Sequence, residues 1–326
     1  MKSVSRRGLL RGGAAALVAL GLVACGDDGV AGTRDSVLER SKVTVAVFPS
    51  MNAVAAAAAA EAGIFTRRGL DVELEVLGTP GQAIPQVLGG QIDFALVDLT
   101  APLIAMSKGV PILYVAGGVV GRPPTGESPL AFGNIWVRPN SPITTIRELE
   151  NATFAIPEIN SQIWVTIRRA VDEAGGDSSK IRFMEAPNTV AALRAGQVDA
   201  ITTSEPVGTL SLDDPDMRFL CHNPSEGMTT AFITSRRFAH RNPDTVLAFR
   251  AAMLEANHLA NTDEALRVSA AAQIMDLEPE LISRSVFPQF AERQIEATDI
   301  VDATTAMDRY GLLPEGVPTP DEALFV

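Results

Sequence analysis

Short apolar runs alternate along the chain with stretches that have helical spacing. Val43–Phe48 is a compact apolar run that predicts a central strand, and the alanine-rich stretch after it predicts a helix ending at Gly63. Val72–Val76 alternates apolar with acidic residues, as an edge strand does, and Ile112–Val115 is a further apolar run. This order of strands and helices predicts an α/β fold with a mostly parallel sheet that helices cover on both faces.

One phrase occurs twice, as LGGQIDFA from Leu88 and as LRAGQVDA from Leu193. Each copy predicts a helix that stops at glycine, a short turn, and a buried strand with a polar end. Gly90 and Gly196 stand where a helix terminus needs a left-handed backbone, which glycine adopts without strain. The repeat predicts two lobes of similar build around a shared cleft, although helix–glycine–strand is also a common connection that can recur by coincidence.

The alternation restarts after Gly117–Pro129, a segment rich in Gly and Pro that we expect to be a surface excursion. Thr229–Thr234 is expected to return to the first lobe, and the chain from Phe238 onward is expected to be helical. In the second lobe we expect strands at Ile135–Val137, Phe154–Ile156, Ile181–Met184 and Arg218–Leu220, and a long helix from Asn160 or Ser161 to Ala174.

The first residues resemble an export signal rather than part of the fold. The basic stretch SRRGLL, from Ser5, resembles a twin-arginine signal, and a short apolar run follows it. LVAC, which ends at Cys25, resembles a bacterial lipobox and implies cleavage before Cys25 and lipidation of its thiol. An unprocessed N-terminal anchor helix is the alternative, and the sequence leaves the export route, twin-arginine or general secretory, open.

These patterns predict six segments. They are a cleaved signal peptide (1–24), a lipidated tether (25–41), the first part of lobe 1 (42–118), a hinge excursion (119–131), lobe 2 (132–225), and a return to lobe 1 with C-terminal helices (226–326).

Composition narrows the possible partners. The chain has 326 residues, 46% of them hydrophobic, which is enough for two ordinary cores. Its formal net charge of −12 argues against nucleic acid as a partner, because phosphate binding needs a basic face. The only cysteine besides Cys25 is Cys221, so a lipidated Cys25 leaves no intramolecular disulfide, and we expect Cys221 to be buried.

Catalytic motifs are not found in the sequence. The three histidines, His222, His240 and His258, are too far apart for a His-x-x-x-His metal pair. The sequence also has no Gly-x-Ser-x-Gly elbow and no Walker loop. We therefore expect no catalytic residues, no metal and no cofactor.

Polar helix starts follow several of the predicted strands. Ser50 with Asn52, Thr79–Gln82, Asn160–Gln162, and Asn188 with its neighbour are of this kind. In open parallel sheets these points share the carboxyl edge, where ligands bind, and free N–H groups there suit an anion. Each such residue can equally serve only as a helix cap. Arg122 either binds an anionic group of the ligand or is a solvated loop residue.

The sequence resembles a family of ABC-transporter binding proteins for nitrate, sulfonates, taurine and thiamine precursors. EAGIF from Glu61 with GLDV from Gly69 resembles an early phrase of that family, and GQIDF from Gly90 and GQVDA from Gly196 resemble its two hallmark phrases. Glu205 and the proline after it resemble its Trp-Glu-Pro. The resemblance implies a type II periplasmic-binding-protein fold, in which two α/β lobes close on a small molecule.

The resemblance also implies ligand-binding positions on the loops after the strands. Two departures, Ser204 in place of an aromatic residue and an acidic Glu158, put a small inorganic anion in doubt. They make an uncharged or aromatic-acid ligand more plausible. The expected ligand-binding residues are Ser50, Met51, Asn52, Thr79, Pro80, Gly81, Gln82, Asp98, Leu99, Thr100, Asn160, Ser161, Gln162, Trp164, Asn188, Thr203, Ser204 and Glu205.

The resulting hypothesis is an extracytoplasmic solute-binding protein, anchored to the cell membrane by lipid on Cys25. It is expected to be a monomer that binds a sulfonate, a carboxylate or aromatic acid, or a pyrimidine, and delivers it to the permease and ATPase subunits of an importer. One alternative is an enzyme like the pyridoxal-phosphate-dependent synthases of a thiamine pyrimidine precursor. Another is a surface sensor domain that presents ligand to a receptor.

Overall fold

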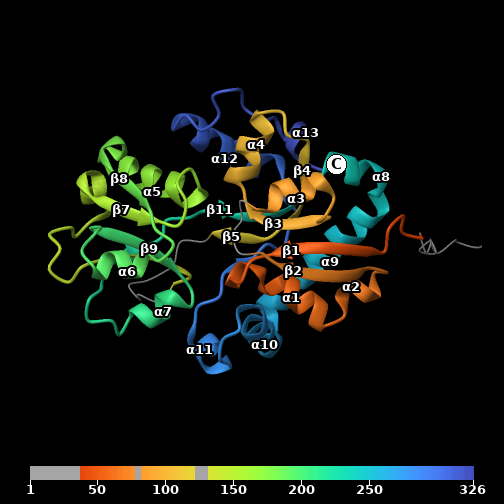
Figure 1. The fold of residues 1–326 in the computed structure, drawn as a ribbon, viewed down its shortest axis with the longest axis horizontal. Coiled ribbons are helices and arrows are strands. Elements are labelled where there is room, and N and C mark those ends of the chain that lie inside the picture. The colour runs from red at the N-terminus through yellow and green to blue at the C-terminus, as the bar shows by residue number, and fades with distance from the viewer. Residues whose placement is uncertain (1–36, 78–81, 122–130) are drawn as a thin grey trace, which may run out of the picture. The chain divides into compact units, whose positions relative to one another are not determined.

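A computed structural model describes residues 37–77, 82–121 and 131–326 (Figure 1). The predicted signal peptide and Cys25 lie outside the described residues, as do Thr79, Pro80, Gly81 and Arg122. The described chain forms two five-stranded sheets flanked by helices and a third, three-stranded sheet. The expected α/β class is therefore confirmed.

The first sheet has the strand order β2-β1-β3-β12-β4. β12 runs antiparallel to both of its neighbours, and β1 runs parallel to β2 and β3. The acidic strand β2 lies at the edge, and β12 brings the chain back from the second sheet, as the sequence predicted. The strands are β1 (Lys42–Val47), β2 (Asp71–Val76), β3 (Phe94–Asp98), β4 (Ile112–Gly117) and β12 (Thr230–Ser235).

The second sheet has the strand order β10-β6-β9-β7-β8 and repeats the plan of the first. Again one strand, β6, runs antiparallel to both neighbours, while β7 runs parallel to β8 and β9. We call the first sheet with its helices lobe 1 and the second sheet with its helices lobe 2. The strands are β6 (Gly133–Val137), β7 (Thr153–Ile156), β8 (Arg182–Glu185), β9 (Ala200–Ser204) and β10 (Arg218–His222).

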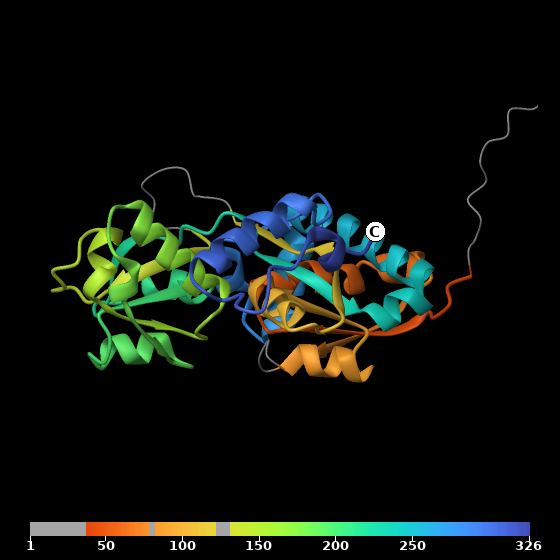
Figure 2. The ribbon, with the colours of Figure 1, turned by 90° about the horizontal axis from the view of Figure 1, so that it is seen from above.

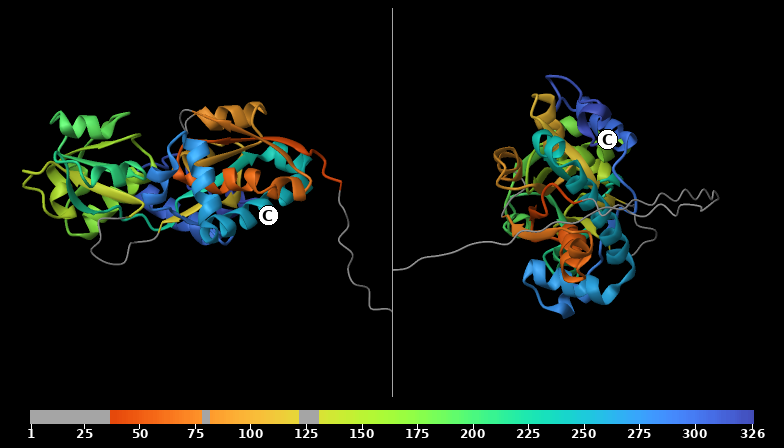
Figure 3. Two further views of the ribbon diagram at one scale, coloured as in Figure 1. Left: turned by 90° about the horizontal axis from the view of Figure 1, so that it is seen from below. Right: turned by 90° about the vertical axis from the view of Figure 1, so that its right-hand side faces the viewer.

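Helices cover both faces of each sheet because successive strand residues point to opposite sides. In β1, Val45 packs toward α1 and α9, whereas its neighbour Ala46 packs toward α3 on the other face. Figure 2 shows α3 and α9 on opposite sides of the sheet. In lobe 2, α5 and α6 lie on opposite faces in the same way, as Figure 3 shows at left. The helices named here are α1 (Val54–Glu61), α3 (Ala83–Gly89), α5 (Gln162–Glu173), α6 (Thr189–Arg194) and α9 (Pro243–Thr262).

Five of the eleven remaining described helices lie in the C-terminal part of the chain, where helices were expected from Phe238 onward, although the strand at Gln289–Phe290 interrupts that part. The eleven are η1 (Met51–Ala53), α2 (Ile64–Arg67), α4 (Thr100–Ser107), η3 (Ile146–Asn151), η4 (Ser178–Lys180), α7 (Val207–Ser211), α8 (Arg236–Arg241), α10 (Glu264–Met275), α11 (Pro279–Arg284), α12 (Ala297–Arg309) and α13 (Pro320–Ala323). None of the described helices is both long and apolar enough to span a membrane.

The third sheet corrects one expectation. The segment from Gly117 was predicted to be a surface excursion, but Val119 is 1% exposed and begins a strand. This strand, β5 (Val119–Gly121), pairs antiparallel with β11 (Gly227–Met228) on one side and β13 (Gln289–Phe290) on the other. β5 and β11 lie where the chain leaves lobe 1 and where it comes back. We call the three strands the hinge sheet.

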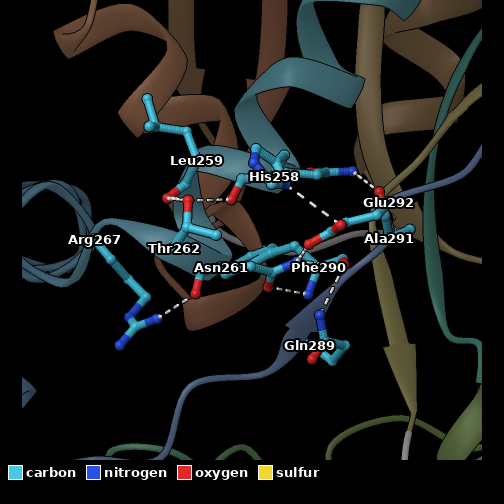
Figure 4. A network of polar contacts seen from close by, with 10 residues as sticks. His258, Leu259, Asn261, Thr262, Arg267, Gln289, Phe290, Ala291 and Glu292 are labelled. Carbon is cyan, nitrogen blue, oxygen red and sulfur yellow. Dashed lines mark hydrogen bonds and ion pairs between the residues drawn. The ribbon is translucent and has the colours of Figure 1, made fainter.

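Helix α9 holds the hinge sheet through two asparagine side chains. Asn257 donates to the carbonyl oxygens of Gly117 and Ala291 at 3.0 and 2.8 Å. Asn261 exchanges hydrogen bonds with the backbone of Phe290, and its amide also donates to the Glu292 carboxylate (Figure 4). The edge strand β13 is thereby fixed to lobe 1.

The two copies of the repeated phrase have the same local structure. Gly90 and Gly196 both have left-handed backbones, with φ of 73° and 69°, so this expectation is confirmed. The aspartate in each copy accepts a hydrogen bond from the strand beside it. Asp93 accepts from the N–H of Thr44 at 3.0 Å, and Asp199 accepts from the N–H of Thr153 at 2.8 Å. The phrase thus pins β3 to β1 in lobe 1 and β9 to β7 in lobe 2.

Candidate functional site

A cavity of about 1100 Å³ lies where the carboxyl ends of the strands of both lobes meet the hinge sheet. Asn52 follows β1, Asp98 ends β3, and Pro157, Pro187 and Ser204 mark the ends of β7, β8 and β9. The hinge sheet adds β5 and the start of β13. The cavity therefore occupies the sheet edge at which α/β folds bind ligands.

Five of the residues expected from the sequence line this cavity. They come from both lobes, and the strand or helix that carries each one explains its position. The five are Asn52 in η1, Asp98 at the end of β3, Ser161 and Gln162 at the start of α5, and Ser204 at the end of β9.

The other expected residues that the structure describes lie elsewhere. Leu99 and Thr100 are 2% and 3% exposed, and with Gln162 they line a second cavity of about 430 Å³ between α5 and α12. Ligand contact by any of these residues stays a prediction. The expected residues that line neither cavity are Ser50, Met51, Gln82, Asn160, Trp164, Asn188, Thr203 and Glu205.

Several of these residues have structural partners that explain their presence. Asn188 caps α6 by accepting from the N–H of Ala191 at 3.0 Å. Thr203 accepts from the indole N–H of Trp136 at 2.8 Å, and Met51 is fully buried in the core between the first sheet and α1. Each has a role in the fold that needs no ligand.

Trp164 joins the lobes at a place other than the cavity lining. The guanidinium of Arg168 lies 4.6 Å from the ring centres of both Trp164 in α5 and Tyr310 beyond α12. The hydroxyl of Tyr310 donates to Asp172 at 2.9 Å, and Arg309 pairs with the same carboxylate at 3.3 Å. These aromatic and ionic contacts connect α5 of lobe 2 with the end of α12.

The cavity also has lining residues that the sequence did not reveal. Phe132 lies just before lobe 2 begins, Asn223 follows β10, and Arg267, Phe287 and Asn261 come from α10, the segment before β13, and α9. These residues belong to segments without a recognisable motif. Only one feature of the sequence indicated them: the segments that connect the two lobes must run beside the shared cleft.

The described lining carries three charged side chains, Asp98, Glu158 and Arg267. Asp98 accepts hydrogen bonds from the N–H groups of Thr100 and Ala101 at 2.8 and 3.0 Å. Burial raises the pKa of Asp98, although these hydrogen bonds and one from the N–H of Gln162 oppose the shift. Asp98 of lobe 1 thus contacts the first turn of α5 in lobe 2.

Glu158 stands at the rim of the same cavity. Partial burial raises its pKa, and the negative charges of Asp98 and Glu185 raise it further. Glu185 in turn accepts from the N–H of Ile159 at 2.8 Å and so holds the loop before α5. The carboxylates of this loop and of Asp98 therefore concentrate negative charge on one side of the cavity.

Metal-binding groups are not found among the described residues, which contain no cluster of three or more His, Cys, Asp or Glu able to hold an ion. The Cys221 thiol is free, and burial raises its pKa to about 12. His258 lies on exposed helix surface and pairs with Glu292. None of these groups forms a nucleophile–base pair at the cavity.

Comparison with known proteins agrees with the fold. A family model described as NMT1/THI5 like matches residues 50–264. The curated protein sequences include no match to the chain.

Solved structures resemble the whole described fold. The alkanesulfonate-binding protein SsuA from Xanthomonas axonopodis pv. citri, solved with MOPS, has a TM-score of 0.70 and 20% identity over 89% of this chain and 99% of its own. The ligand-binding component of an ABC-type import system from Staphylococcus aureus has a TM-score of 0.72 and 14% identity over 88% and 97%. The nitrate-binding protein NrtA from Synechocystis PCC 6803 has a TM-score of 0.63 and 17% identity over 86% and 84%. These likenesses establish the periplasmic-binding-protein fold expected from the sequence.

Proposed function

The chain belongs to the NMT1/THI5-like family, and from that premise we propose that it is the extracytoplasmic solute-binding protein of an ABC importer. It captures a small organic solute between its lobes and delivers the solute to a membrane permease. The observation that carries the proposal is the cavity of about 1100 Å³, lined by the strand ends of both lobes beside the hinge sheet. A ligand there touches both lobes at once, so that binding favours their approach.

The binding step needs no covalent chemistry. The lining offers hydrogen-bonding groups from Asn52, Asp98, Gln162 and Ser204, and ring surface from Phe132. Such a mixture of apolar surface with a few polar groups is typical of small-molecule sites. The absence of a nucleophile–base pair in the described lining favours capture over the enzyme alternative, and transport over synthesis of a thiamine precursor.

Export and anchoring complete the proposal. The twin-arginine-like stretch and the lipobox ending at Cys25 support a lipoprotein held on the outer face of the cell membrane. The protein acts there as a monomer beside the permease and ATPase subunits. A sensor that presents ligand to a receptor would use the same fold, and transport assays in membranes separate the two roles.

A thermal-shift panel on the chain from residue 26 onward tests solute binding. The panel compares alkanesulfonates, taurine, nitrate, benzoates, phthalates and pyrimidines. A ligand at a hundred times its dissociation constant should stabilise the protein by about 2.7 kcal/mol. One responding class supports the proposal, and no response from this panel or from organic cations contradicts it.

A pair of glutamine variants tests whether the ligand that raises the melting temperature binds in the cavity. Gln162→Ala removes a lining side chain and should weaken the shift, whereas Gln197→Ala removes an exposed glutamine outside the lining and should leave it unchanged. Equal effects of both variants would place the ligand elsewhere. Turnover of a bound ligand into a product would favour the enzyme instead.

A further inference from the structure

The cavity lining carries acceptor groups on Asp98, Glu158 and Asn52. Asp98 contributes a carboxylate at the end of β3, and Glu158 contributes another from the loop before α5. The amide oxygen of Asn52 is buried in the lining and has no hydrogen-bond partner among the described residues. A buried acceptor without a partner costs free energy, which a ligand donor can recover.

No cation among the described residues neutralises these two carboxylates. Asp98 is held by backbone N–H groups only, and no described Lys, Arg or His lies within ion-pair distance of Asp98 or Glu158. The charges of Asp98 and Glu158 disfavour each other, and Glu185 adds to the repulsion. A positive group between them would relieve this repulsion and gain two charge-assisted hydrogen bonds.

The one cationic side chain in the described lining, Arg267, donates to protein acceptors through one terminal nitrogen, and its Nε is buried without a hydrogen-bond partner among the described residues. One terminal nitrogen of Arg267 donates to the carbonyl oxygens of Ala260 and Asn261, at 3.2 and 3.4 Å, as Figure 4 shows for Asn261. Its guanidinium also lies 4.6 Å from the ring centre of Phe287. Arg267 is thus held at the carbonyl end of α9, where the helix dipole favours a cation.

A metal ion does not fit the acidic side. The described residues contain no group of three or more His, Cys, Asp or Glu arranged to hold one, and Asp98, Glu158 and Glu185 do not form such a group. The cavity volume and the ring of Phe132 in the lining instead suit an organic cation, because an aromatic ring attracts positive charge. The charge on this side therefore selects the chemistry of the solute.

Resting on the proposed function of this cavity, we propose that its solute carries a protonated nitrogen group, an organic ammonium or amidinium, bound by Asp98, Glu158 and the Asn52 amide oxygen. This assignment differs from the sulfonate, carboxylate and nitrate classes that the sequence resemblance left open.

Sets of probes with one shape and three charges test the assignment. Calorimetric titration of the chain from residue 26 onward compares benzamidinium with benzamide and benzoate, and hexylammonium with hexanol and hexanesulfonate. The cation of each set should bind at least about tenfold more tightly than the neutral or anionic member, which is the range expected of charge-assisted hydrogen bonds.

Variants that each remove one negative charge test whether the preference for the cationic probe depends on Asp98 and Glu158. Glu158→Gln and Asp98→Asn should each weaken binding of the cation by about tenfold, and should weaken it more than they weaken binding of the neutral probe. Asp98→Asn keeps an oxygen that can accept from Thr100 and Ala101, so the cap on α4 is retained. Glu315→Gln removes the same charge from an exposed residue outside both cavities and should change nothing.

The pH dependence gives a second readout. Binding of the cation should weaken as pH falls from 7 toward the raised pKa values of Asp98 and Glu158, which lie above their ordinary 3.8 and 4.5. Binding of benzamide should not show this pH dependence, because benzamide carries no charge that could interact with the carboxylates.

The outcomes separate this assignment from the proposed function. Tighter binding of an anionic probe, or cation binding that neither variant weakens, overturns the assignment and leaves solute capture standing. Failure of every probe here and of every solute in the thermal-shift panel overturns both. Cation selectivity that Glu158→Gln and Asp98→Asn abolish, and that Glu315→Gln keeps, supports the assignment.

Discussion

Two aspartates on the same strand segment, Asp93 and Asp98, show how position decides the role of one residue type. Asp93 is 2% exposed, accepts from the N–H of Thr44 and pairs with Arg40 at 3.1 Å, so its charge is used inside lobe 1. Asp98 lies at the other end of β3 and lines the cavity without a cation. The sequence marks both as polar strand ends, and only the structure separates the one that locks strands from the one that meets the cavity.

Glu205 should make stability depend on pH in an identifiable way. It is 3% exposed, burial raises its pKa above the ordinary 4.5, and hydrogen bonds from Thr209 only partly oppose that shift. A raised pKa means a stabilising contribution that is complete below pH 4.5 and is lost as pH rises through the folded-state value. Glu205→Gln imitates the protonated form, so its free energy of unfolding minus that of the wild type should increase from pH 4 to 7, by about 1.4 kcal/mol for each pKa unit of the shift.

A flat difference across this pH range would contradict the prediction for Glu205. Melting curves of the two proteins in matched buffers measure it, and the difference cancels the contributions of other carboxyl groups.

Asp172 should have the opposite pH dependence. Burial acts to raise its pKa, but hydrogen bonds from Ser178 and Tyr310 and the charge of Arg309 lower it overall below 3.8. Asp172→Asn should therefore cost about 1–3 kcal/mol at neutral pH, and this cost should vanish as pH falls through the folded-state value. Urea unfolding at pH 7 and pH 3 measures it. Asp308→Asn, on an exposed residue of α12, is the control expected to stay neutral.

Trp164 illustrates why residue-level prediction of the site was incomplete. Gln162 opens α5 and lines the cavity, and Trp164 follows it by two positions. Successive residues of a helix turn by about 100°, so positions two apart face nearly opposite directions. Trp164 is accordingly 9% exposed in the core beside Tyr310. Proximity in sequence to a helix start was therefore not sufficient evidence for ligand contact.

At the level of elements, the polar helix starts differ in what their side chains do. Thr145 forms a capping box with Glu148, and Asn188 caps α6, whereas Ser161 makes no cap hydrogen bond. Ser161 lines the cavity, and its hydroxyl donates to the carbonyl oxygen of Glu158 at 2.7 Å. The sequence located these starts within a residue or two, because capping residues are typical of helix termini, but it did not distinguish working caps from ligand positions.

Replacement of the cap on α6 should separate stability from binding. Asn188→Ala removes the acceptor for the Ala191 N–H and should lower the free energy of unfolding by about 1 kcal/mol. Asn188→Asp keeps an acceptor and should restore most of that loss. Denaturant unfolding together with titration of the best ligand checks both. Weaker binding at unchanged stability would instead support the ligand role expected from the sequence.

The short strands of the hinge sheet were the elements that sequence patterns missed. β5 and β13 have three and two residues, too few to show a period, and Gly and Pro surround β5. Their pairing partners lie more than a hundred residues away, so no local signal indicates them. Longer elements such as β1 and α5 carry their pattern within themselves and were predicted closely.

At the level of the molecule, the two sheets follow one plan. In each, a single antiparallel strand stands between the third strand and the last, and the chain supplies it just after crossing from the other lobe. The repeated phrase in the sequence predicted this likeness, because it marks the same helix–turn–strand unit in both lobes. The cavity lining from α10 and the residues before β13 was not predictable, since it depends on how the C-terminal segments pack.

The crossing strands should tolerate no added bulk at Gly121. A Cβ atom there would lie 2.6 Å from the carbonyl oxygen of Ser225 and 2.7 Å from its carbonyl carbon, both closer than real contacts allow. Gly121→Ala should therefore cost about 1–3 kcal/mol through overpacking.

Gly89→Ala provides the matched control for this prediction, because the nearest atom to its Cβ is a flexible glutamine tip at 3.8 Å. Thermal unfolding of both variants measures the cost. Equal stability of the two would mean that the backbones of the crossing segments separate without penalty.

The pairing of β5 with β11 has a consequence for how the protein is divided. Gly121 lies opposite Gly227, so the chain enters and leaves lobe 2 at neighbouring points. Lobe 2 is thus an insert carried by lobe 1, and a tight turn between those two glycines would be long enough to close the gap after its excision. All five strands of the first sheet and α9 would remain. Lobe 1 would therefore keep its own core and about half of the residues that line the cavity, but it would lack the residues that lobe 2 contributes.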